Sequence, residues 1–478
     1  MLLNHGVNAS EQATSVNTPV VAESGIPFVV GIAPVQSATK PAKSGVPVLC
    51  TSWDEAVAAL GYSDNWETYS LCEFMYSHFK LFGCQPVIFC NVLDLTKADS
   101  KETVEATDMT ITAQQIKLPI EAINDNTLVI KAAGDQGEAY VLDTDYSVYY
   151  EGENLVIEFL EESDVVKNKA TSASVAYTKA KPKSITDVEI ADGFEAIELC
   201  LTRVGITPDL ILSPGFSQKS TIAAVMATKA SNFNDIFKAK AICDIDSSLN
   251  GATSYDDVLT SKNDANMVDS EQIVCWPMVK LGDKMFHMST QLAGLMAKID
   301  SENEGCPYES PSNKNLKIDS LVLKNGNQVD LTIAQANHLN SNGVVTALNF
   351  FNGWVAWGNY TACYPFNTDA KDYFIPVSRV FKWVDNTLVK TFWKNVDDPT
   401  NRRLIDSVLD TANIWMNGLV GKGYLYGGRF EMLESENPKE AVMAGKIKIH
   451  CYITPPAPAQ QIDFVTEYDV NYIQSALG

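Results

Sequence analysis

The sequence lacks long apolar runs and an obvious targeting segment. No stretch of about 18 consecutive apolar residues occurs in the 478 residues, so we expect no membrane-spanning helix. The first residues have neither the basic start nor the apolar run of a signal peptide, which predicts a protein kept in cytosol-like surroundings. The hydrophobic content of 46% is ordinary for folded protein, and the length predicts about three domains.

Cysteine spacings typical of metal or redox sites are also missing. The ten cysteines are scattered, form no C-x-x-C pair, and lie mostly within apolar runs. We therefore expect buried, reduced thiols rather than disulfides or a zinc site.

Positive charge is scarce and unevenly distributed. The net charge of −23 argues against nucleic acids and anionic membranes as partners, because such binding depends on clustered Lys and Arg. Residues 371–478 hold 12 Lys and Arg against 13 Asp and Glu, a net of −1, so residues 1–370 carry −22. The last hundred residues therefore differ in kind from the rest.

Motifs that carry catalysis are absent as well. None of the five histidines lies in an H-E-x-x-H or H-x-E pattern, and no G-x-S-x-G motif occurs. The glycines around Lys422 end a predicted helix instead of preceding one, so they do not form a phosphate-binding loop. Asp244 and Asp246 end a predicted strand without a calcium loop after them, and we interpret them as turn-capping residues. We expect no catalytic residue, no metal site and no cofactor.

The order of predicted elements indicates a split α/β domain. After a polar N-terminal arm (1–19), alternating strands and helices occupy 20–95 and resume in 184–355. Short β-rich runs are expected at Val20–Val21 and Phe28–Ile32, a helix capped by Ser52 and Glu55 follows, and the stretch around 315–342 is expected to be loop-rich.

The segment between these halves has a different texture. Residues 96–183 are rich in Thr, Val, Asp and Glu and alternate polar with apolar positions. They predict an inserted, all-β, sandwich-like outer domain. Residues 94–183 hold 9 basic against 17 acidic residues, which suits a solvated surface.

Residues 356–454 predict a C-terminal α+β domain. Val380, Val384, Leu388 and Phe392 recur at helical spacing, and a second stripe follows at Ile405, Val408, Ala412, Trp415 and Leu419. Residues 445–453 alternate as a strand does, with isoleucines on one face and Lys446, Lys448 and His450 on the other.

The chain ends in a predicted arm, residues 455–478. Pro455, Pro456 and Pro458 form a stiff, extended spacer, which we interpret as a hinge. Beyond it, one face of a predicted strand is apolar, at Ile462, Phe464, Tyr468, Val470 and Tyr472. Two outcomes stay open for this strand: it joins the sheet of a neighbouring chain, or it folds back on its own domain.

A family resemblance bears on this choice. The stretches FWKNVDDPTNRRLIDSVLDTANIWMNGLVGKGYLYGGRFEML and NPKEAVMAGKIKIHCYITPPAPAQQIDFVTEYD resemble the C-terminal domain of contractile phage tail sheath proteins over about 372–473. SGIPFVVGIAP, near the start, resembles the opening of that family's first domain. The resemblance implies a subtilisin-like α/β domain without the protease triad, with the inserted and C-terminal domains described above.

The function implied by this resemblance is structural. It implies a non-enzymatic subunit that stacks in hexameric rings, polymerises helically around a tail tube, and contracts to drive the tube through a target envelope. The terminal strand and Val20–Val21 would then complete sheets in neighbouring subunits. The implied partners are further copies of the chain, the tube protein, and the baseplate and tail terminator proteins, in a particle assembled in bacterial cytoplasm. A phage tail, a bacteriocin-like tail and another injection system fit equally.

Charge indicates candidate contacts with the tube. The stretch from Arg379 to Arg403 contains six basic residues and three acidic ones. We expect some of Lys390, Lys394, Arg402 and Arg403 to make weak contacts with an acidic tube surface. The alternative function is a cytosolic hydrolase whose site assembles from distant Ser, His and Asp residues. Self-assembly distinguishes the two, because an enzyme should stay a small soluble oligomer.

Overall fold

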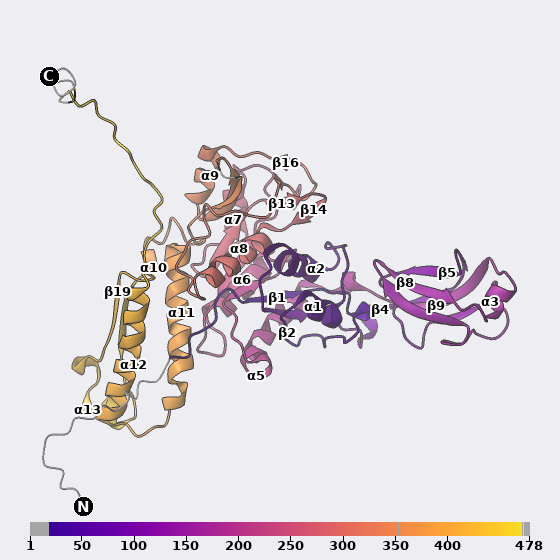
Figure 1. The fold of residues 1–478 in the computed structure, drawn as a ribbon, viewed down its shortest axis with the longest axis horizontal. Helices are drawn as coiled ribbons and strands as arrows, with labels where there is room; N and C mark the ends of the chain where they lie inside the picture. Colours follow the sequence, from indigo (N-terminus) through magenta and orange to yellow (C-terminus); the bar gives the residue numbers. More distant parts are fainter. Residues whose placement is uncertain (1–18, 352, 471, 473–478) are drawn as a thin grey trace, which may run out of the picture.

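The computed structural model describes residues 19–351, 353–470 and 472. They form a central α/β part between an elongated β-rich part and a helical C-terminal part (Figure 1). Most of the predicted N-terminal arm and the last six residues of the predicted C-terminal arm lie outside the described residues. Within the described residues, no helix is both long and apolar enough to cross a bilayer.

The central part is built on an eight-stranded sheet. Its inner strands run parallel in the order β17-β12-β11-β10-β1-β3, and the antiparallel strands β18 and β2 form the two edges. Inner strands such as β1 are buried throughout, which explains their continuous apolar sequence. The strands are β1 (Pro27–Gly31), β2 (Val48–Cys50), β3 (Val87–Asn91), β10 (Leu210–Leu212), β11 (Lys240–Asp244), β12 (Gln272–Cys275), β17 (Val344–Asn349) and β18 (Trp354–Trp357). A mixed α/β fold is confirmed.

Helices connect these strands, and one of them lies in the core. Helix α8 has 12 of its 15 residues buried, so it packs on nearly every side. The helices of the central part are α1 (Trp53–Leu60), α2 (Ser70–Met75), α4 (Asp187–Gly193), α5 (Cys200–Val204), α6 (Ser220–Ser231), α7 (Val258–Asp264), α8 (Met288–Glu302) and α9 (Ile333–Asn340). A π-helical turn, Tyr76–Phe82, continues α2.

Local signals in this part have mixed outcomes. The predicted cap of α1 is confirmed, because Ser52 Oγ accepts the Glu55 amide at 3.2 Å, although the Glu55 carboxylate binds Thr51. The loop-rich prediction for 315–342 is wrong in part. That stretch contains α9, which a capping box of Thr332 and Gln335 begins, and two strands of a small antiparallel sheet. The strands of this sheet are β13 (Met278–Leu281), β14 (Lys284–Phe286), β15 (Ser320–Val322) and β16 (Gln328–Val329).

The β-rich part extends from the edge of the central part. It has two three-stranded antiparallel sheets, ordered β4-β9-β6 and β5-β8-β7, around a separate apolar core that includes Ile130, Ile157 and Phe159. Its elements are β4 (Lys101–Thr110), β5 (Gln115–Pro119), β6 (Val129–Ala132), β7 (Tyr146–Glu151), β8 (Asn154–Phe159), α3 (Asp164–Lys167) and β9 (Ser172–Ala180).

The C-terminal part is a helix pair covered by a two-stranded sheet. The two long helices α11 and α12 enclose a small core that includes Val380, Trp383, Val384, Ala412 and Met416. Strand β20 is shorter than predicted, because the amide of Lys448 binds Asn437 Oδ1 at 2.8 Å instead of a neighbouring strand. The elements are α10 (Ala370–Tyr373), α11 (Ile375–Phe392), α12 (Arg402–Gly421), β19 (Gly427–Glu431), α13 (Lys439–Met443) and β20 (His450–Thr454).

Candidate assembly surfaces

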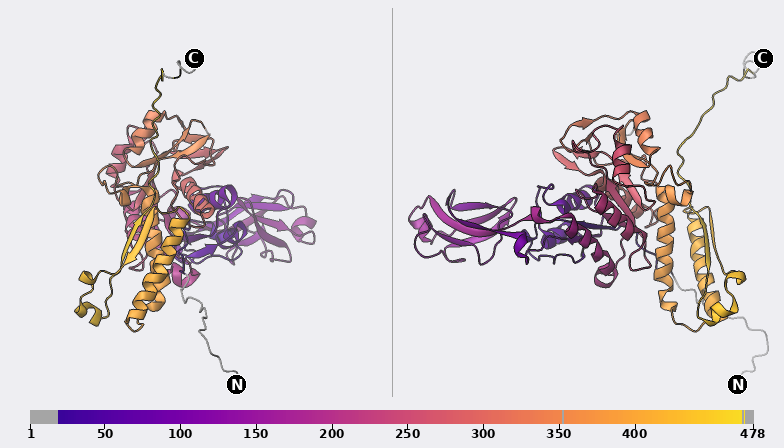
Figure 2. Two further views of the ribbon diagram at one scale, coloured as in Figure 1. Left: turned by 60° about the vertical axis from the view of Figure 1, so that its left-hand side comes forward. Right: turned by 180° about the vertical axis from the view of Figure 1, so that it is seen from behind.

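The C-terminal segment beyond β20 leaves the body of the subunit. Residues 455–470 are not part of any strand, so the predicted final strand is not formed within the described chain. Figures 1 and 2 show the segment extending into solvent. Phe464 is 89% exposed and Tyr468 81%. Folding back on its own domain is therefore not seen, and the role of this segment in a neighbouring subunit stays a prediction.

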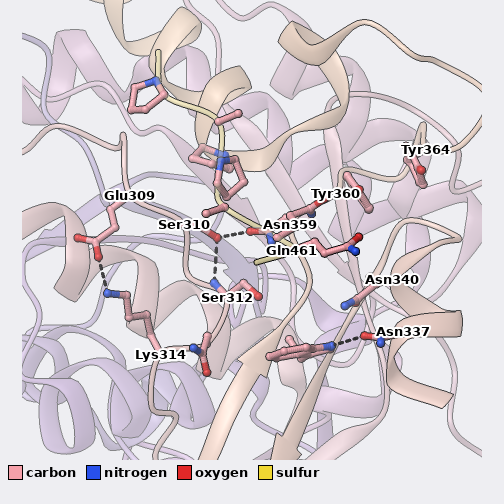
Figure 3. Close-up of a pocket in the computed structure, with 18 of the residues that line it drawn as sticks. Glu309, Ser310, Ser312, Lys314, Asn337, Asn340, Asn359, Tyr360, Tyr364 and Gln461 are labelled. Carbon is pink, nitrogen blue, oxygen red and sulfur yellow. Dashed lines mark hydrogen bonds and ion pairs between the residues drawn. The ribbon is translucent and has the colours of Figure 1, made fainter. Parts of the chain in front are cut away.

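The proline spacer is held against the body of the subunit where it begins. Pro455 is buried, and Pro456 and Pro458 line a groove of about 830 Å³ between the spacer and the central part (Figure 3). The hydroxyl of Tyr360 donates to Gln460 Oε1 at 2.6 Å, and its ring stacks on Tyr364 with centroids 3.9 Å apart. The first half of the spacer is thus attached to the body, and the exposed part begins after it.

Val20 and Val21 do not form the predicted strand. The amide of Val20 donates to Thr391 Oγ1 at 3.0 Å, and that hydroxyl donates back to the Val20 carbonyl at 3.3 Å. The amide of Ala22 donates to Thr387 Oγ1 at 3.0 Å. Side chains of α11 therefore hold this backbone within the single chain, and the pairing of Val20 and Val21 with a neighbouring subunit stays a prediction.

The two-stranded sheet β19–β20 has an open edge at β20, whereas on the β19 edge Asn413 of α12 binds the amide and the carbonyl of Phe430. The strands pair antiparallel from Gly427 opposite Thr454 to Glu431 opposite His450, and no further strand of the described chain joins them. On the inner side, Phe430 is buried in the small core. On the outer side, Arg429 lies over the ring of Tyr452 at 4.2 Å. An edge of this kind can accept an added strand.

The basic residues between Arg379 and Arg403 divide into two groups. Arg379, Lys382 and Lys390 form ion pairs inside the chain; Lys390, a predicted tube contact, pairs with Glu23. Lys394, Arg402 and Arg403 are exposed at the turn between the helices. Arg402 forms a local ion pair, with its Nε 3.6 Å from Oδ2 of Asp406 one turn further along α12. The exposed group alone is accessible for contact, and sequence reasoning missed this division because the acidic partners of the first group are distant in sequence.

One cluster of Ser, His and Asp does form, as the hydrolase alternative requires. Asp244 accepts hydrogen bonds from the amide of Ser289 at 2.9 Å and from the hydroxyl of Ser217 at 3.2 Å, while His287 Nδ1 lies 2.8 Å from Glu73. Among the described residues no serine is hydrogen-bonded to His287, so this cluster lacks the serine–histidine contact of a triad. The two carboxylates instead cap the start of α8.

Other sequence-based candidates have structural roles. Asp246 accepts the amide of Ser248 at 2.9 Å, as a turn-capping residue does. Lys422 follows the end of α12 and pairs with Glu304. Nine of the ten cysteines are buried and Cys451 is half-buried. Within the described ranges, no group of three or more His, Cys, Asp or Glu side chains is arranged to hold a metal ion.

Comparison with known proteins gives similarity over nearly the whole chain. No family model matches the chain. The tail sheath protein of Burkholderia phage BcepMu is 24% identical over 495 aligned residues, which cover 99% of this chain and 98% of that protein. The contracted helical sheath of the anti-feeding prophage has a TM-score of 0.57 at 15% identity, covering 98% of this chain and all of the other.

A second solved structure matches equally well. The six-fold symmetrised baseplate of the anti-feeding prophage contains a chain with a TM-score of 0.56 at 17% identity, and the match covers 98% of this chain and 100% of that one. Sequence and fold thus agree over the same length. The resemblance to contractile tail sheath proteins is therefore confirmed, and it extends over nearly the whole chain.

Proposed function

We propose that this chain is the structural subunit of a contractile tail sheath. It polymerises as stacked hexameric rings around a tail tube and contracts to drive the tube through a target cell envelope. The similarity to a helical sheath and to a six-fold baseplate supports this proposal. The observation that carries it is the exposed segment of alternating apolar and acidic residues, which joins no sheet among the described residues, on a subunit that also has an open-edged sheet.

The chemistry of the two surfaces is complementary. The terminal segment alternates apolar residues such as Phe464 with acidic ones such as Asp463 and Asp469. The chain leading into β20 alternates isoleucines with Lys446 and Lys448. If the segment of one copy lies along β20 of another, apolar side chains meet on the inner face. Pairing of its acidic residues with Lys446 and Lys448, which precede β20, would require Lys448 to leave Asn437 and Glu436, which it binds within the single subunit.

The directions of the chain ends suit this connection. The described chain begins beside the end of α11, where Val20 contacts Thr391, and the C-terminal segment leaves from the opposite end of the C-terminal part (Figure 2). A subunit can thus be linked to copies on two sides, so the array stays connected while its rings move. The energy of contraction would come from the array relaxing between two packings, with no nucleotide required.

Further parts of the proposal follow from the same resemblance. We infer a subtilisin-like topology for the central part and the domain division given above, a non-enzymatic role, and assembly in bacterial cytoplasm into a tail particle. Tail terminator and tube proteins are proposed partners alongside the baseplate. Lys394, Arg402 and Arg403 are the exposed candidates for the tube, each contributing at most about 1 kcal/mol. Charge reversal at Lys394 and Arg402 should weaken co-assembly with the tube protein. Unchanged co-assembly would show that these residues do not contact the tube.

The test of the main proposal is self-assembly. The full chain should form hollow helical tubes in negative-stain electron microscopy, and a truncation ending at Thr454 should not. Phe464→Asp should abolish tubes, because this residue belongs to the apolar face. Val465→Asp, one position along and on the opposite face, is the matched control and should still assemble. Compact particles from the full chain would contradict a sheath, and an assay for hydrolase activity would then follow.

A further inference from the structure

One face of α11 meets the central part through charged and amide side chains. Arg379, Lys382, Asn386 and Lys390 are spaced by three or four residues, so they share a face of the helix. Each of them is bonded to a residue outside the C-terminal part. The opposite face of α11 packs on α12 through apolar side chains. The junction between the C-terminal part and the central part is therefore polar, whereas the core between α11 and α12 is apolar.

Arg379 joins three separate stretches of chain. Its Nη1 donates to Asp300 Oδ1 at 3.0 Å and its Nη2 to Asp209 Oδ2 at 2.8 Å, so it connects α11 to α8 and to the start of β10. The hydroxyl of Ser24 donates to Asp300 at 2.6 Å, and the amide of Ile26 donates to Asp209 at 2.7 Å. We refer to Ser24, Asp209, Asp300 and Arg379 as the Arg379 cluster.

The Arg379 cluster is buried and directional. The side chain of Arg379 is 3% exposed and that of Asp300 is not exposed at all. Burial raises the pKa of Asp209, and the guanidinium opposes that change. A buried pair of this kind adds little net stability over apolar packing, but its planar, bidentate geometry tolerates only one arrangement.

A second contact on the same face acts in the same sense. Lys382 pairs with Glu271, and the amide of Asn386 donates to the carbonyl of Lys238 at 2.8 Å while its oxygen accepts the Lys238 amide at 3.0 Å. These partners lie at the start of β11 and β12. Two points of attachment along α11 fix the angle between this helix and the central part. A single point would let the helix rotate about it.

We propose that Arg379 is a positioning residue, which fixes the angle between the C-terminal part and the central part. The N-terminal segment passes through the Arg379 cluster, and the C-terminal segment follows the sheet packed on α12. The cluster therefore also sets where residues 19–24 lie along α11 and the direction in which the C-terminal segment leaves the subunit. The consequence for assembly rests on the proposed sheath function, whereas the angle within one chain does not.

The first test uses the unassembled full chain. In Arg379→Lys the charge stays, but one ammonium cannot hold both carboxylates in the guanidinium geometry. The amide of Ile26 should exchange hydrogen at least tenfold faster, while amides of β8 in the distant β-rich part stay unchanged. Ser24→Ala removes one hydroxyl from the cluster and should act in the same direction if Arg379→Lys fails to fold. Arg203→Lys, at an exposed position on α5, is the matched control and should change neither amide.

The second test measures orientation. Small-angle X-ray scattering of the unassembled Arg379→Lys chain should differ from that of the parent, and its tubes should show an altered or broadened helical twist by cryo-electron microscopy. The proposal would be overturned if the Ile26 amide exchanged at the parental rate in both Arg379→Lys and Ser24→Ala. It would also be overturned if exchange became faster while the scattering curve and the helical twist stayed those of the parent. If the parent chain forms no tubes, the sheath function fails, but exchange and scattering still decide the role of Arg379.

Discussion

Two carboxylates, Glu73 and Asp244, accept hydrogen bonds from the backbone at the start of α8. The amide of His287 donates to Glu73 at 2.7 Å and that of Ser289 to Asp244 at 2.9 Å. Negative charge at this end of a helix is favourable, because the first amides are unsatisfied and the helix dipole is positive there. A Ser, His and Asp cluster here therefore has a structural explanation.

The charge of His287 makes this cap sensitive to pH. Burial disfavours the imidazolium, but the Glu73 carboxylate outweighs it and raises the pKa of His287 to about 9. An unfolded histidine titrates near 6.5, so the pair contributes full stability below that pH and loses it as the pH rises through about 9. The amount is about 3 kcal/mol, an order-of-magnitude figure from the shift.

We therefore expect Glu73→Gln to lower the free energy of unfolding most at low pH. The amide oxygen can still accept the His287 backbone bond, so the change removes mainly the charge. The loss should approach about 3 kcal/mol at pH 6 and shrink by pH 10, measured by urea unfolding at both values. Glu67→Gln, an exposed acid nearby, is the control. An equal loss at both pH values would contradict this account.

At the scale of elements, α11 organises its surroundings through both of its faces. Its apolar stripe was predictable from helical spacing, and Val380 and Val384 are indeed buried. Its polar face also holds Val20 and Ala22 by their backbone, which the β-like sequence of that segment did not indicate. The residues that decide this, Thr387 and Thr391, lie more than 360 positions away.

Trp383 provides a test of this attachment. Its indole Nε1 donates to the Ala22 carbonyl at 2.8 Å, and its ring lies 5.5 Å from that of Trp415. Trp383→Phe keeps a ring but leaves a buried carbonyl without its donor, so we expect a loss of about 1 to 3 kcal/mol in urea unfolding. Trp393→Phe, which is 63% exposed, should change stability by no more than about 0.5 kcal/mol. Similar losses in both variants would argue against the attachment.

At the scale of the whole molecule, the β-rich part is attached at closely spaced ends. Lys101 pairs with Ala180 where the chain enters and leaves, and the amide of Lys181 donates to the carbonyl of Ser100 at 2.8 Å. Further contacts run from Ser63 and the amide of Asp64 to Glu153, each at 2.6 Å, and from Gln36 to the carbonyl of Ile120 at 3.1 Å. With its own core, this part depends little on the remainder of the chain.

Replacing residues 102–179 by a short glycine-rich linker should therefore leave a folded chain. Its ends need no rearrangement, because they are already neighbours across β4 and β9. We expect a cooperative thermal transition by circular dichroism and, under the proposed function, tubes of smaller outer diameter. A fragment of residues 94–183 should also unfold cooperatively. Aggregation of the shortened chain would show that the insertion supports the central part.

The sequence by itself determined the properties that depend on neighbours along the chain. Strand and helix periodicity, the Ser52 cap, the change of texture at the β-rich insertion and the exposed alternation of the terminal segment are all local patterns. The missed helix α9 also had a local signal, the spacing of Thr332 and Gln335.

Only the tertiary structure decided which charges are free and where the chain ends go. Arg379 and Lys382 resemble Lys394 and Arg402 in sequence, yet the first two are buried against acids from distant strands and helices. Such pairing depends on which segments the fold brings together, and spacing along one helix does not contain that information. The same holds for Val20, whose backbone partner is a threonine on α11 and not a strand.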